Sequence, residues 1–347
     1  MKLAFIISTG IIWETSWGSY GDRDYYFISC TTDLFTEYCR SNDRLLASEH
    51  LSLINQSLIH WTCLEACEYE CMTKITSQRL ESNGDVLKYY GHWPFIRYFG
   101  IEEPASVIFS LLNAVYHLKF SAAYILRGIS GIKSEIGCHP QIASWIFLYS
   151  TAATLAWVMS SIYHSKKTPY ATELDLTFAM GVLVTGLLVV IRRLMGLRCI
   201  NYIQGCSLFL VGFFGFAIRA KGIFDGSVSF SSHMYSSIAL FVITTTLWCY
   251  WACFYDENSL IWTQRRTSDM MTHSKQRRAR WLCLLCNIWL LLAALLEVLD
   301  FPPIWGIFDA HSLWHAATIP LGPLWYYFWE LDYHSQLQLE EEEEKKQ

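Results

Sequence analysis

Long apolar runs separated by short polar segments dominate the chain from Pro104 onward. A helix of about twenty apolar residues spans the hydrocarbon core of a bilayer and satisfies its own backbone hydrogen bonds. Seven runs approach that length, at residues 104–126, 141–163, 174–192, 199–218, 231–254, 281–300 and 311–330. The pattern therefore predicts an all-α membrane protein in which residues 104–330 form a domain of seven transmembrane helices.

The N-terminus follows a different pattern. Lys2 precedes a short apolar stretch, Leu3–Ile12, and small residues follow near Ser16 and Gly18. This arrangement is typical of a secretory signal peptide, predicted here for residues 1–18, with a short amphipathic anchor as the alternative. After cleavage, the polar segment of residues 19–103 would begin in the secretory lumen.

Cysteines are frequent in this lumenal segment, which contains Cys30, Cys39, Cys63, Cys67 and Cys71. In an oxidising compartment they predict disulfides, but their number is odd and the pairing cannot be deduced. Zinc binding by the last three is less favoured, because their spacing lacks the two-residue knuckles of common zinc sites. Asn55 begins a glycosylation sequon, which is consistent with lumenal exposure.

Composition and charge support this topology. Only 16% of the 347 residues are charged and 53% are hydrophobic, as is typical of a membrane protein. The sequence lacks the basic patch interleaved with aromatic residues that is typical of a nucleic-acid-binding protein. With a lumenal N-terminus, the cytosolic loops are 127–140, 193–198 and 255–280, and they hold ten Lys and Arg residues against four in the lumenal loops. This bias agrees with the positive-inside rule. Residues 331–347 then form an acidic cytosolic tail, which we expect to be disordered.

Polar side chains gather where three of the runs reach the lumenal side. The second run ends, the third begins and the seventh begins there, and they contribute Ser160, His164, Asp175, Asp309, His311 and His315. His311 and His315 are four residues apart, so a helix projects both imidazoles from one face. Desolvating such groups without partners costs several kcal/mol, and the shared depth predicts that they form one site. Capping histidines at a membrane interface are the alternative.

Three imidazoles are a ligand set of catalytic zinc sites. The sequence thus predicts zinc at His164, His311 and His315, which would lower the pKa of a bound water. Asp175 can act as general base, and Ser160, one turn before His164, can orient the water or donate to an oxyanion. Asp309 is interpreted as a carboxylate that orients a ligand imidazole. Two alternatives stay open: Asp175 as a helix N-terminal acid, and a metal-free triad with Ser160 as nucleophile.

These residues resemble a known pattern. Ser160-x-x-x-His164, Asp175 and His311-x-x-x-His315 are similar to the motif of the CREST superfamily of membrane hydrolases, which includes alkaline ceramidases and the adiponectin and progestin receptors. Further motifs resemble the post-GPI-attachment lipid-remodelling family within that group. They are Trp61–Cys71, Gly91–Phe95, Glu103–Ser106, Leu296–Pro303 and Asp309–His311, and the resemblance runs from about Ser19 to Pro320.

The resemblance implies a function. Members of this family act on GPI-anchored proteins in the endoplasmic reticulum or Golgi membrane and remove the sn-2 acyl chain of the anchor as a phospholipase A2. It also implies seven helices, a lumenal site, and zinc at the three histidines with Ser160 and Asp175 beside the water. One departure concerns the disulfides: the family usually has another cysteine between the positions of Cys39 and Cys63, and this chain has none.

Two other functions remain as alternatives. A different lipid hydrolase of the superfamily, such as a ceramidase, would not require the long cysteine-rich segment. A non-enzymatic receptor or chaperone for GPI-anchored cargo would not require Ser160, Asp175 and three histidines together. The family resemblance makes GPI-anchored proteins and membrane lipid the expected partners.

Overall fold

The computed structural model describes residues 19–39, 59–130, 140–195, 202–255 and 270–344. Within these ranges the regular elements are helices, joined by turns that contain three isolated bridges. The predicted signal peptide and Asn55 lie outside the described residues. The chain divides into two compact units. We call residues 1–109, 161–168 and 294–316 the site unit, and residues 110–160, 169–293 and 317–347 the bundle unit.

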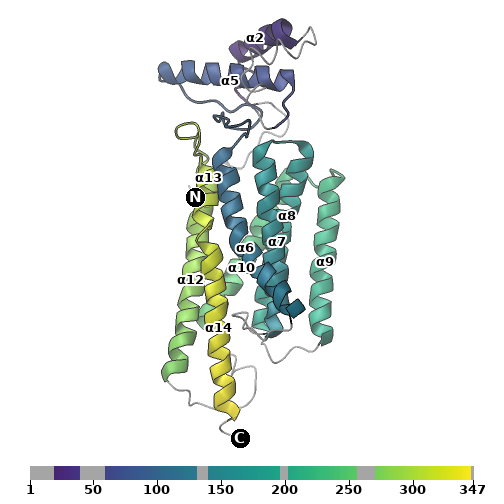
Figure 1. The fold of residues 1–347 in the computed structure, drawn as a ribbon, viewed down its shortest axis with the longest axis vertical. Coiled ribbons are helices and arrows are strands. Elements are labelled where there is room, and N and C mark those ends of the chain that lie inside the picture. Colours follow the sequence, from purple (N-terminus) through teal and green to yellow (C-terminus); the bar gives the residue numbers. More distant parts are fainter. Residues whose placement is uncertain (1–18, 40–58, 131–139, 196–201, 256–269, 345–347) are drawn as a thin grey trace, which may run out of the picture. The chain divides into compact units, whose positions relative to one another are not determined.

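Long helices make up the bundle unit and run lengthwise in Figure 1. Including the turns that extend into the site unit, they are α6 (Pro104–Ser130), α7 (Pro140–Ser165), α8 (Pro169–Leu194), α9 (Tyr202–Phe224), α10 (Phe230–Phe254), α12 (Met270–Leu299) and α14 (Leu321–Glu344). Helix α8 packs against both α9 and α10. Three of these helices begin at a proline, whose fixed φ suits the first turn and whose missing N–H is not needed there.

Five helices of the described chain are long and apolar enough to cross a membrane: α7 from Ile142, α8, α9 from Ile203, α10, and α12 from Lys275. The prediction of a multi-pass, all-helical membrane protein is therefore confirmed for these five. The first predicted run corresponds to α6, which buries the polar side chains of Asn113 and His117. The crossing of the membrane by α6 stays a prediction.

The seventh predicted run is interrupted. It forms the short helix α13 (Ala310–Thr318) and then α14, with Pro320 between them. Proline removes a backbone donor and disfavours the helical conformation of the residue before it, so one continuous helix cannot pass through this point without a break. Helix α14 continues to Glu344, so the expectation of disorder throughout 331–347 was wrong. Leu, Gln and Glu are good helix formers, which accounts for this extension.

Aromatic side chains and one ion pair form the centre of the bundle unit. The ring of Trp248 packs against Trp251 and Phe328 at centroid distances of 5.9 and 5.5 Å. Beside them, the Arg193 guanidinium makes two hydrogen bonds of 2.8 Å to the Asp332 carboxylate, and both residues are buried. The pair joins α8 to α14 with the bidentate geometry that suits arginine and a carboxylate.

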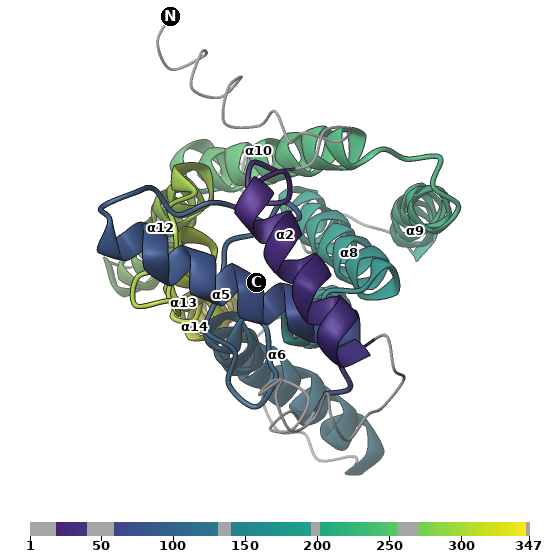
Figure 2. The same ribbon diagram turned by 90° about the horizontal axis from the view of Figure 1, so that it is seen from above.

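The cysteine-rich part of the site unit contains α2 (Tyr25–Leu34), the π-helix η1 (Phe35–Cys39) and α5 (Cys63–Glu81). Figure 2 shows α2 crossing α5. Asp24 caps the start of α2, and Thr62 and Glu65 form a capping box at the start of α5. Each cap accepts hydrogen bonds from N–H groups that have no partner within the helix.

Two disulfides join these helices, Cys30–Cys71 and Cys39–Cys63. They confirm the prediction of disulfides and supply the pairing that the sequence left open. Cys67 is a buried free thiol, with its Sγ 3.5 Å from that of Cys39. The Cys39, Cys63 and Cys67 sulfurs lie together, but a disulfide consumes two of them and leaves no set of thiolates for a metal.

Candidate metal centre

Three imidazoles converge in the site unit. His164 lies at the C-terminal end of α7, and His311 and His315 lie one turn apart on α13. The Nε2 atom of His311 is 3.3 Å from Nε2 of His164 and 2.8 Å from Nε2 of His315. His164 and His315 are almost fully buried, and the potential ligand atoms of the three residues lie within 4.8 Å of one another. The sequence prediction that these histidines meet is therefore confirmed.

Carboxylates hold two of these imidazoles in place. Glu103 Oε2 lies 2.6 Å from Nδ1 of His164, and Glu297 Oε2 lies 2.7 Å from Nδ1 of His311. An ionised carboxylate can only accept, so in both pairs Nδ1–H donates. In the neutral form of each imidazole, that tautomer leaves the Nε2 lone pair directed at the shared centre. Histidines that bind metals commonly donate their second ring N–H to a carboxylate in this way.

Glu103 is fixed by several further contacts. Its carboxylate forms a close ion pair with the Lys167 ammonium and accepts a hydrogen bond of 3.3 Å from Ser106 Oγ. Its backbone N–H donates to the carbonyl of His164 at 3.0 Å. Burial alone would raise the pKa of Glu103, but Lys167 and His164 hold that pKa well below its ordinary value. The carboxyl group is therefore ionised and remains an acceptor for the imidazole.

The sequence prediction did not include Glu103 and Glu297 in the site. Glu103 lies 61 positions from His164, and Glu297 lies 14 positions from His311. In neither pair do the two residues share a helix, so helical periodicity does not connect them. Two signals were available in the sequence. Each acid lies beside or within an apolar run, and each falls within a motif that carried the family resemblance, Glu103–Ser106 or Leu296–Pro303.

Asp309 contacts the helix rather than an imidazole. Its carboxylate accepts a hydrogen bond of 2.8 Å from the backbone N–H of Ser312, and Ser312 Oγ donates to the Asp309 carbonyl. This is N-cap geometry, which fixes the first turn of a helix. The imidazole contacts that were expected of Asp309 come from Glu103 and Glu297. Asp309 thus positions His311 and His315 through the start of α13.

Ser160 and Asp175 belong to the bundle unit. Ser160 is buried one turn before His164 in α7 and accepts a hydrogen bond of 3.4 Å from Ser110 Oγ. Asp175 is half-buried in the second turn of α8, which has no acidic residue in its first turn. Helix-dipole effects decline beyond the first turn, so they do not account for Asp175. The roles of both residues at the histidines stay predictions.

Comparison with known proteins places these residues in a family. The model of the Per1-like family matches residues 53–333, a range that includes all the histidines and carboxylates of the site. No solved structure matches the chain.

Relatives with similar full lengths occur in distant organisms. The protein of Xenopus tropicalis named GPI-specific phospholipase A2-like PGAP3 is 30% identical over 310 residues, covering 89% of both chains. Post-GPI attachment to proteins factor 3 of Drosophila melanogaster is 28% identical over 93% of this chain and 92% of its own. Protein PER1 homolog of Schizosaccharomyces pombe is 28% identical over 89% of this chain and 86% of its own.

Proposed function

The chain belongs to the Per1-like family, and on that premise we propose that it is a zinc-dependent hydrolase that removes the sn-2 acyl chain from the lipid of GPI-anchored proteins. The observation that carries the proposal is the convergence of three imidazole Nε2 atoms while carboxylates bind Nδ1 of two of them. A relative named GPI-specific phospholipase A2-like supports the substrate class and the ester chemistry.

The donor set fits zinc. His164, His311 and His315 would hold the ion through Nε2, with a fourth position for water or substrate. The Nε2 atoms of His164 and His315 lie 3.3 Å and 2.8 Å from Nε2 of His311, so the three nitrogens would be available to one ion. When bound, zinc would act as a Lewis acid on the ester carbonyl and lower the pKa of water. Ionised Glu103 and Glu297 would add negative charge beside the centre and keep both imidazoles in the ligating tautomer.

Two residues of the bundle unit supply proton transfer and orientation in this proposal. Asp175 accepts a proton from the attacking water and returns it to the leaving alcohol of the glycerol backbone. Ser160 directs its hydroxyl to the water or to the oxyanion that forms on the carbonyl. Ester cleavage by this route consumes one water and releases a free fatty acid and a lyso-lipid.

The compartment follows from the topology. We place the protein in the Golgi or endoplasmic reticulum membrane with its N-terminus in the lumen and its C-terminus in the cytosol. Two disulfides in the cysteine-rich segment support an oxidising compartment for that segment. GPI-anchored proteins are exposed on the same face, so the substrate and this segment share a compartment.

Two rival functions make different predictions. A ceramidase of the same superfamily would hydrolyse an amide in ceramide and leave GPI lipid unchanged. A non-enzymatic receptor would bind GPI-anchored cargo equally well with or without the three histidines. A metal-free mechanism with Ser160 as nucleophile would keep full activity in the presence of a strong zinc chelator and lose it in Ser160→Ala.

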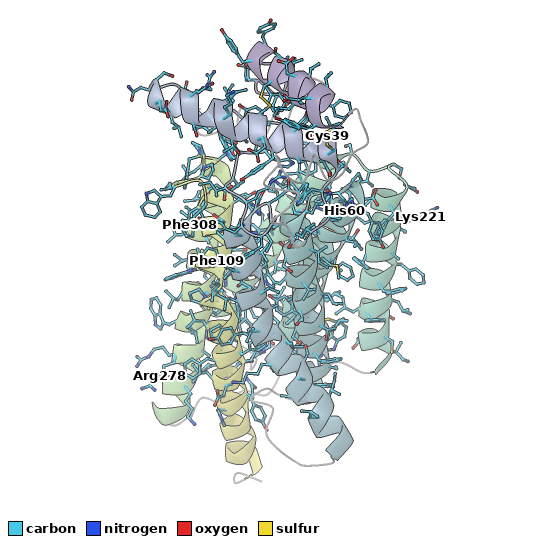
Figure 3. The ribbon with its side chains drawn as sticks, turned by 45° about the horizontal axis from the view of Figure 1, so that its top comes forward. Cys39, His60, Phe109, Lys221, Arg278 and Phe308 are labelled. Carbon is cyan, nitrogen blue, oxygen red and sulfur yellow. A yellow bond between two sulfur atoms is a disulfide. The ribbon has the colours of Figure 1, made fainter. Side chains whose placement is uncertain are left out.

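Lipid analysis of GPI anchors tests the proposal. Cells in which the endogenous protein is replaced by wild type, His311→Ala or Asp175→Ala would be compared by mass spectrometry of the anchor lipid. We expect both variants to retain unsaturated sn-2 chains that wild type removes. His60→Ala is the matched control, because His60, labelled in Figure 3, is an exposed histidine of the site unit that does not belong to the cluster of three. Normal removal of these chains by His311→Ala would contradict the proposal.

A further inference from the structure

An apolar cavity of about 510 Å³ lies in the site unit. Its walls come from three segments: the turn at residues 98–101, the first turns of α6 from Pro104 to Phe109, and Ile307 with Phe308. All ten side chains that line it are aliphatic or aromatic, and the Tyr98 hydroxyl is the one polar side-chain group among them. Phe109 and Phe308 lie close together on its wall (Figure 3), with ring centroids 6.3 Å apart and planes inclined by 27°.

Two residues of the cavity wall are sequence neighbours of residues that position the imidazoles. Pro104 directly follows Glu103, whose carboxylate binds the imidazole of His164. Phe308 directly precedes Asp309, which caps the helix that carries His311. A ligand in the cavity would therefore lie against residues whose backbone neighbours position the imidazoles.

Exposed apolar side chains form the edge of the cavity. Phe99 is 67% exposed and Ile108 is 55% exposed. Phe99 also has a φ of 52°, a left-handed conformation that is uncommon for a bulky aromatic residue. The turn that holds it is closed by a hydrogen bond of 3.0 Å from Ile101 N–H to the Tyr98 carbonyl. Exposed apolar patches of this kind mark sites that contact an apolar ligand or a membrane.

The chemistry of the walls selects one class of ligand. A sugar or a peptide would leave its polar groups without hydrogen-bond partners against aliphatic and aromatic walls, which is costly. The nearby Arg97 guanidinium is already paired with Glu102 at 2.9 Å. An acyl chain needs no polar partner, and the volume falls within the range of about 300–1,000 Å³ that is usual for ligand sites.

We propose that this cavity holds an acyl chain of the glycerolipid substrate while the ester lies at the three histidines. The assignment rests on the proposed function for the identity of the ester, but binding of the chain is measurable without hydrolysis. The cavity would then influence the length of the chain that the site accepts, because its volume of about 510 Å³ limits the space available.

Photo-crosslinking tests binding directly. The probe is a phosphatidylinositol whose sn-2 chain is ether-linked, and so cannot be hydrolysed, and ends in a diazirine. Full-length protein in phosphatidylcholine nanodiscs would be irradiated with it and the adducts mapped by mass spectrometry. We expect adducts to concentrate on residues 98–109 and 307–308, and Ile108→Trp to lower this labelling about tenfold by filling the cavity.

Leu111→Trp is the matched control, because Leu111 is an exposed residue of α6 that does not line the cavity. It should label like wild type. Adducts spread evenly over exposed apolar residues elsewhere, such as Val211 of α9, would show contact with bulk lipid alone and would overturn the assignment.

Hydrolysis of substrates with sn-2 chains of different lengths gives a second readout. Ile108→Trp should shift the ratio of kcat/KM values towards shorter chains by about tenfold, and Leu111→Trp should leave the ratio unchanged. Failure of the proposed activity and failure of the chain site would give different results. Labelling of the cavity in a protein that hydrolyses no ester would support the chain site and reject the proposed activity. Hydrolysis with no enrichment of cavity adducts and an unchanged chain-length profile would reject the chain site alone.

Discussion

Two groups of charged and polar side chains in this protein are built on different principles. In the bundle unit, Arg193 and Asp332 bind each other through two hydrogen bonds of 2.8 Å. In the site unit, Glu103 and Glu297 each bind one nitrogen of an imidazole, and the other nitrogens face a common point. The first arrangement is complete in itself and holds helices together. The second directs lone pairs towards a ligand, so it indicates a binding site.

Removing a histidine should produce the largest effect on function. We expect His311→Ala to lower ester hydrolysis by at least about 10³-fold, because loss of a ligand removes several kcal/mol of transition-state stabilisation. Fatty acid release by purified protein in detergent would measure this. The variant should melt at the temperature of chelator-treated wild type, since both lack the metal. Activity within a few fold of wild type would show that the imidazoles of the site unit are no more important for hydrolysis than the ion pair of the bundle unit.

Breaking the ion pair should instead act on stability. Asp332→Ala leaves Arg193 buried without its charge partner and should cost about 3–5 kcal/mol, visible as a lower melting temperature. The fraction that remains folded should keep its metal and its specific activity. Replacing both residues by leucine should restore much of the lost stability, because no buried charge is left unpaired. Wild-type melting of Asp332→Ala would show that the pair is dispensable.

The carboxylates beside the imidazoles should have an intermediate effect. Glu297→Gln should weaken metal affinity about 10–100-fold, since a residue of this kind fixes the ligating tautomer. Titration with a competing chelator measures this without reference to activity. Asp300→Asn is the control, because Asp300 lies three residues further and binds Lys88 and Trp93 rather than a histidine. Equal metal affinities for the two variants would show that Glu297 does not position a metal ligand.

The smallest effect should come from Cys67. Burial, with contributions from Glu68 and Glu70, raises the pKa of this thiol to about 11. The reactive thiolate is therefore scarce at neutral pH, and its fraction should grow about tenfold per pH unit up to the pKa. Peptide-resolved mass spectrometry after iodoacetamide treatment should find Cys67 unmodified at pH 7 and increasingly modified above pH 9. Rapid labelling at pH 7 would contradict this environment.

Much of this architecture could be predicted because it depends on local patterns. Run lengths predicted the five apolar helices, and the spacing of His311 and His315 placed both on one helix face. The break before α14 had a visible cause in Pro320, although run length alone did not reveal it. The carboxylates Glu103 and Glu297 were missed, because their partners are distant in sequence and only the folded chain brings them together.

The disulfides illustrate a different limit. An odd number of cysteines permits many pairings, and sequence spacing does not select among them. The packing of α2 and η1 against α5 decides the pairing by bringing Cys30 to Cys71 and Cys39 to Cys63. Long-range geometry of this kind is set by packing, as it is for the two carboxylates of the metal centre.

Metal content of the purified full-length protein tests the central claim most directly. Mass spectrometry of the metals in active wild type and in His60→Ala should find about one zinc per chain, the stoichiometry of a single three-histidine site. The double variant His164→Ala, His311→Ala should contain almost none. Active wild-type protein with a zinc content near zero would contradict the account, and hydrolysis would then have to proceed without the metal.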